Sequence, residues 1–137
     1  MMKTTNQLPR CARALSPVLR YSLVLLLGAV TVASKTPGMK IMMGSGVDGA
    51  TYVHGTQALD FEALVKRGGL TPARALQAGT VINAQIMGVN DRVGSLEPGK
   101  FADVIAVAGD PLADITELQR VKFVMKGGKV VRDELAR

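Results

Sequence analysis

The chain has 137 residues, of which 47% are hydrophobic and 4% are aromatic, and its formal net charge is +6. This length allows one ordinary domain with a real core, and the hydrophobic content argues against a disordered chain. Because aromatic residues are scarce and tryptophan is absent, the platforms on which nucleic-acid bases stack are nearly missing.

The positive charge is concentrated at the N-terminus. Four of the 17 basic residues lie in the first twenty positions, where no acidic residue occurs: Lys3, Arg10, Arg13 and Arg20. The other 117 residues therefore hold 13 basic against 11 acidic residues. We expect no nucleic-acid partner for this larger part of the chain.

An uncharged, mostly apolar run follows at residues 21–34. Together with the basic segment before it, this run resembles a secretory signal peptide. Residues 1–34 would then be a leader, the only part to meet a membrane, and the protein would be secreted or periplasmic. The alternative is a buried helix that ends at Pro37 and Gly38, in a cytoplasmic protein. The run is shorter than the ~20 residues that a stable transmembrane helix needs.

The middle of the chain predicts one strand and three helical segments. Residues 40–43 form a short apolar run typical of a buried strand. Apolar residues then recur at helical spacing over residues 57–67, and a second helix is expected over residues 71–78. Its N-cap is Thr71, followed by a proline at the first helical position. Residues 80–87 predict one or two further helical turns.

The last third of the chain predicts a small β unit. Short strands are expected at residues 93–96 and within 102–108, and a single helical turn at residues 114–118. A hairpin follows, in which residues 121–126 and 129–132 flank Gly127-Gly128.

Candidate chemistry is confined to the glycine-rich loop at residues 44–55. Asp48 is a candidate metal ligand or general base, or a turn residue that caps nearby N–H groups. His54 is a candidate metal ligand or proton shuttle, or a hydrogen-bonded loop residue. Ser45 with Asp48 and His54 suggests a nucleophile and base, but the G-x-S-x-G elbow is absent. Cys11 and His54 are the only residues of their types, so one copy of the chain cannot build a site of several imidazoles or cysteines.

From about residue 40 to residue 131, a series of motifs resembles the C-terminal end of metal-dependent amidohydrolases of the imidazolonepropionase-like and Xaa-Pro-dipeptidase-like branch. The matching residues are Gly44-Ser45-Gly46-Val47-Asp48, His54-Gly55, Gly69 to Leu76, Asn83-Ala84, Asp91 to Val104, Gly109-Asp110-Pro111-Leu112 and Gly127-Gly128-Lys129-Val130.

The resemblance implies an α/β fold: the last strand and helices of a TIM-like barrel at residues 35–90, then a small β unit, part of a β-sandwich, at residues 91–137. It implies a divalent metal, zinc by expectation, and an Asp after the last barrel strand that binds metal and takes a proton from the attacking water. Asp48 occupies that position if Gly46-Val47-Asp48 is the match, whereas Gly46 occupies it if the match begins at Gly44-Ser45. The family's other ligands, mostly histidines, do not occur in this chain.

Three functions follow. The first is a hydrolase of C–N bonds in a small amide or dipeptide, present as a C-terminal portion in which Asp48 and His54 are the catalytic residues. The second is a non-catalytic module that forms homo-oligomers through exposed apolar surface and strand edges. The third is a small hydrolase that uses Ser45 and His54.

Overall fold

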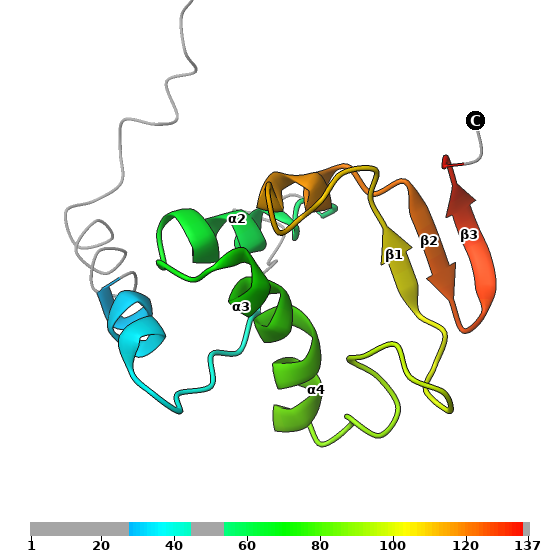
Figure 1. Ribbon diagram of the computed structural model, residues 1–137. Helices are drawn as coiled ribbons and strands as arrows, with labels where there is room; N and C mark the ends of the chain where they lie inside the picture. Colours follow the sequence, from blue (N-terminus) through cyan, green and yellow to red (C-terminus); the bar gives the residue numbers. More distant parts are fainter. Residues whose placement is uncertain (1–27, 45–53, 136–137) are drawn as a thin grey trace, which may run out of the picture.

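A computed structural model describes residues 28–44 and 54–135 of the chain. Figure 1 shows helices gathered at one end of the molecule and a three-stranded sheet at the other. The elements are helical residues 28–35, α2 (Leu59–Lys66), α3 (Pro72–Gln77), the π-helical segment η2 (Ala78–Ile82), α4 (Asn83–Ile86), β1 (Val104–Ala106), the 3₁₀ helix η3 (Ile115–Gln119), β2 (Phe123–Lys126) and β3 (Lys129–Asp133).

Helical residues 28–35 pack where α2 ends and α3 begins. The Arg74 guanidinium donates to the Ser34 carbonyl, and the Thr31 hydroxyl donates to the Arg67 carbonyl at 3.5 Å. Within the described residues no helix is long and apolar enough to cross a membrane. Residues 1–27 lie outside the described part, so the leader remains a prediction.

The second predicted helix is confirmed in detail. Thr71 is the N-cap of α3, its hydroxyl accepts the Arg74 N–H at 3.3 Å, and Pro72 occupies the first turn. The expected break between this helix and the next is absent, because α3, η2 and α4 follow one another without a gap. The run passes through Gly79, where a Cβ would lie 2.6 Å from the Phe61 ring. Glycine therefore admits α2 instead of ending the helix.

The predicted strand at residues 40–43 is wrong. These residues form no strand, and no strand lies beside them within the described part of the chain. The Met43 N–H instead meets the Ala78 carbonyl at 3.4 Å and the Asn83 side chain at 3.0 Å.

The sheet is antiparallel, with the order β1-β2-β3. Gly127 and Gly128 have φ values of 54° and 77° and form the predicted hairpin turn between β2 and β3. The strand predicted at residues 93–96 is wrong, because this segment is a series of bends around Gly94, whose φ is 98°.

The core of the described region is thin. Its buried hydrophobic residues are Leu70, Ala75, Ala78, Ala84, Ile115 and Leu118, and half of them are alanines. No large side chain among the described residues is completely buried. Such a core leaves much apolar surface exposed.

Candidate active site

The segment that leads into the glycine-rich loop is held by one helical run. The Asn83 side chain, at the start of α4, contacts both backbone groups of Met43. Its Oδ1 accepts the Met43 N–H at 3.0 Å, and its Nδ2 donates to the Met43 carbonyl at 2.7 Å. The last residue described before the loop, Gly44, follows directly.

The described chain resumes at His54, on the far side of the loop. His54 is exposed and lies in a turn, and the next N–H, that of Gly55, donates to Gln57 Oε1 at 3.0 Å. Ser45, Gly46 and Asp48 lie outside the described residues. Their predicted roles, and the predicted pairing of Asp48 with His54, therefore stay predictions.

A cavity of about 500 Å³ lies beside this point, between the start of α2 and the sheet. Met43, Ala58 and Phe61 contribute apolar lining, and its basic residues are Arg120, Lys122 and Arg132. Each of the three is ion-paired: Arg120 with Glu117, Lys122 with Glu134 at 3.4 Å, and Arg132 with Glu134 at 2.7 Å. The pairing balances the positive charge around the cavity, which gives it no evident preference for anions.

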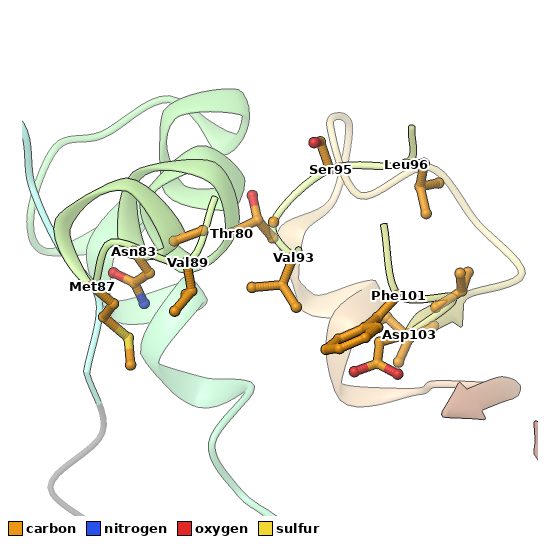
Figure 2. A pocket seen from close by; sticks show the side chains of 14 residues that line it. Thr80, Asn83, Met87, Val89, Val93, Ser95, Leu96, Phe101 and Asp103 are labelled. Atoms are coloured by element: carbon orange, nitrogen blue, oxygen red, sulfur yellow. The ribbon is translucent and has the colours of Figure 1, made fainter. Parts of the chain in front are cut away.

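A second cavity of about 520 Å³ lies between the helical run and the segment that leads into β1. Figure 2 shows Asn83 and Met87 on the helical wall, with Val93 and Phe101 facing them across the cavity. The wall is mostly apolar, and the only carboxylate that lines it is Asp103. The Gly127 N–H and then the Lys126 ammonium lower the pKa of Asp103 below its ordinary value. This carboxylate therefore binds the hairpin and is not poised as a general base.

The described residues do not by themselves fit a divalent metal. Among them, no group of three or more His, Cys, Asp or Glu side chains is close enough to hold an ion. Asp114 accepts from Thr116 at 3.0 Å, Glu62 from Lys66 at 2.6 Å, and Glu97 from Ser95 at 2.7 Å, so these carboxylates have local structural roles.

The sequence analysis gave Asn83 no role of its own. A signal was present, because asparagine is a poor residue for a helix interior and Asn83 stands within the helical run from residue 72 to residue 86. The signal does not name a partner, since Met43 lies 40 positions away in the sequence.

Comparison with known proteins adds the family. A profile described as the amidohydrolase family matches residues 30–131. The chain belongs to the amidohydrolase family. Its members generally use divalent metals.

Two curated relatives illustrate the match. Ochratoxinase from Aspergillus niger is 36% identical over 99 residues, which cover 69% of this chain and 20% of the relative. Imidazolonepropionase from Geobacillus kaustophilus is 41% identical over 66 residues, which cover 46% of this chain and 16% of the relative. The chain thus spans about a fifth of the length of the curated amidohydrolases that it matches.

Solved structures of amidohydrolases extend the match to most of the chain. A prolidase-like protein from Bifidobacterium longum superposes with a TM-score of 0.76 and 31% identity, covering 90% of this chain and 31% of the other. Ochratoxinase from A. niger superposes with a TM-score of 0.71 and 32% identity, covering 90% and 29%. The predicted family is therefore confirmed, and the fold is that of a part of an amidohydrolase.

Proposed function

We propose that the chain is the C-terminal part of a hydrolase that cleaves C–N bonds and that it carries one catalytic loop of that enzyme. The observation that supports this most directly is the superposition of 90% of the chain on solved amidohydrolases at more than 30% identity. On this proposal, the segment before the loop and the helical run form the end of a barrel. The sheet is then part of a small β-sandwich.

The substrate class proposed is a small amide or a dipeptide. The relatives named prolidase, ochratoxinase and imidazolonepropionase are hydrolases of one family. We assign Asp48 as the residue that takes a proton from the attacking water and contributes one metal ligand, with His54 beside it in the same loop. The remaining metal ligands must come from outside this chain's own residues, because it has no other histidine.

A second candidate function is a non-catalytic module that associates with its own copies. It is favoured by β1, which forms an edge of the sheet and carries Ile105, an exposed large apolar side chain. A hydrolase that uses Ser45 and His54 has no comparable support, since Ser45 lies outside the described residues.

Zinc titration of the wild-type chain and of Asp48→Asn tests the role of Asp48, with the oligomeric state recorded in the same preparation. We expect Asp48→Asn to weaken zinc binding at least tenfold, because a carboxylate ligand is lost. Asp91→Asn is the matched control, since Asp91 is exposed and lies 3.8 Å from the Arg92 guanidinium. A wild-type chain that binds zinc no better than Asp48→Asn contradicts the proposal.

A further inference from the structure

Both amide atoms of Asn83 are used on the backbone of a single distant residue. Oδ1 accepts the Met43 N–H at 3.0 Å and Nδ2 donates to the Met43 carbonyl at 2.7 Å, and both contacts are partly buried. An adjacent strand would offer Met43 the same pair, one acceptor and one donor. Within the described part of the chain no strand lies beside Met43, and the asparagine supplies that pair instead.

The same helical run holds Met43 at two further points. The Ala78 carbonyl lies 3.4 Å from the Met43 N–H. The Met43 side chain packs over Gly79, where a Cβ would lie 2.9 Å from the Met43 Cε. Backbone and side chain of Met43 are therefore both fixed to one rigid element.

We propose that Asn83 is a positioning residue for the catalytic loop: it fixes the register in which the chain leaves Met43 and enters residues 44–55. The catalytic part of this inference rests on the function proposed above. Asp48 follows Met43 by five residues, which span at most about 18 Å. A fixed Met43 thus limits where the Asp48 carboxylate can lie.

Asparagine is suited to this role because of what its neighbours in chemistry lack. Aspartate keeps an acceptor for the Met43 N–H but places a second oxygen against the Met43 carbonyl. Alanine leaves both backbone groups without the side-chain partner. Graded loss is therefore expected, with Asn83→Asp between the wild-type chain and Asn83→Ala.

Gln85 gives a matched control on the same helix. Its Oε1 accepts from the Lys40 Nζ at 3.0 Å, so Gln85 also joins α4 to the segment before the loop. This contact joins two exposed side chains and involves no backbone group of the segment. Gln85→Ala should therefore leave the register at Met43 unchanged.

Amide hydrogen exchange on the 137-residue chain tests the inference. We expect Asn83→Ala to raise the exchange rate of the Met43 amide and of amides in residues 44–55 at least tenfold, with β2 unchanged and a smaller effect in Asn83→Asp. In Gln85→Ala all rates should match the wild-type chain. Unchanged loop rates in Asn83→Ala overturn the inference, as does an equal rise in β2, which would show a general structural role.

Zinc affinity adds a second readout that separates this inference from the proposed function. We expect Asn83→Ala to weaken zinc binding about 10–100-fold, as is typical when a residue that orients a ligand is lost, and Gln85→Ala to leave it unchanged. If the wild-type chain binds zinc no better than Asp48→Asn, the proposed function fails, and exchange alone decides whether Asn83 positions the loop. Wild-type zinc affinity in Asn83→Ala, alongside Asp48-dependent binding, overturns the inference.

Discussion

Asp103 ties the start of the sheet to its hairpin. One carboxylate oxygen accepts the Gly127 N–H at 2.6 Å, and the other accepts from the Lys126 Nζ at 2.9 Å. Both contacts favour the ionised form and lower the pKa of Asp103 below 3.8, with the Gly127 N–H as the larger cause. A carboxylate whose pKa is lowered on folding stabilises the folded state at pH values above its unfolded pKa.

Asp103→Asn should therefore lower the melting temperature at pH 7, and the difference should shrink as the pH falls below 3.8. The reason is that wild-type Asp103 becomes neutral as the pH passes through its folded pKa, so that it then resembles asparagine. Thermal unfolding between pH 7 and pH 2 measures this. Asp91→Asn, at an exposed carboxylate, should change little, and a deficit in Asp103→Asn that persists undiminished at pH 2 would contradict the assignment.

At the scale of single elements, Gly94 shows how a bend replaces the strand expected at residues 93–96. Its φ of 98° suits glycine, and a Cβ there would lie 2.7 Å from the Ala84 Cβ and 3.2 Å from the Thr80 carbonyl oxygen. The segment thus turns so that its backbone packs directly on the helical run.

Gly94→Ala should destabilise the protein more than Gly88→Ala. Gly88 ends the helix with a φ of 68° but has open space around it, so alanine there costs about 1–2 kcal/mol for the backbone alone. At Gly94 the clash with Ala84 adds about 1–3 kcal/mol. Urea unfolding of both variants gives the comparison, and equal losses would show that the loop moves away from the helix at no cost.

The elements that the sequence predicted correctly are those set by neighbouring residues. Thr71 and Pro72 begin a helix, and Gly127-Gly128 make a hairpin, because each requirement is local. Gly79 and Gly94 were misread because the first accommodates the distant Phe61 and the second packs on a helix ten residues away. Local periodicity carries no information about such contacts.

The candidate site divides in the same way. The loop of residues 44–55 is evident from its composition and from its family motif. Asn83 could not be assigned a role from the sequence, because its function depends on a backbone 40 residues away. The sequence identifies which residues carry the chemistry, and the structure identifies which residue holds their segment in place.

At the scale of the whole molecule, the two edges of the sheet differ. β3 carries Lys129 and Arg132, and its pairing with β2 is interrupted by a register shift between Val124 and Met125. Charges and irregular pairing are common means of protecting an edge strand. β1 consists of three apolar residues centred on Ile105, which is 55% exposed, and has neither protection.

We therefore expect the 137-residue chain to associate with itself through β1. The thin core exposes further apolar side chains near this edge, with Leu96 78% and Phe101 57% exposed, and contiguous apolar surface favours association. Ile105→Lys should weaken self-association at least tenfold, because a charged side chain on an edge strand opposes pairing with another strand.

Sedimentation velocity over a hundredfold range of protein concentration measures this effect. Val131→Lys is the matched control, since Val131 is an exposed apolar residue on β3, the protected edge. We expect Val131→Lys to associate as the wild-type chain does. Equal weakening in both variants would assign the effect to added charge and not to the β1 edge, and a wild-type chain that stays monomeric throughout would refute self-association altogether.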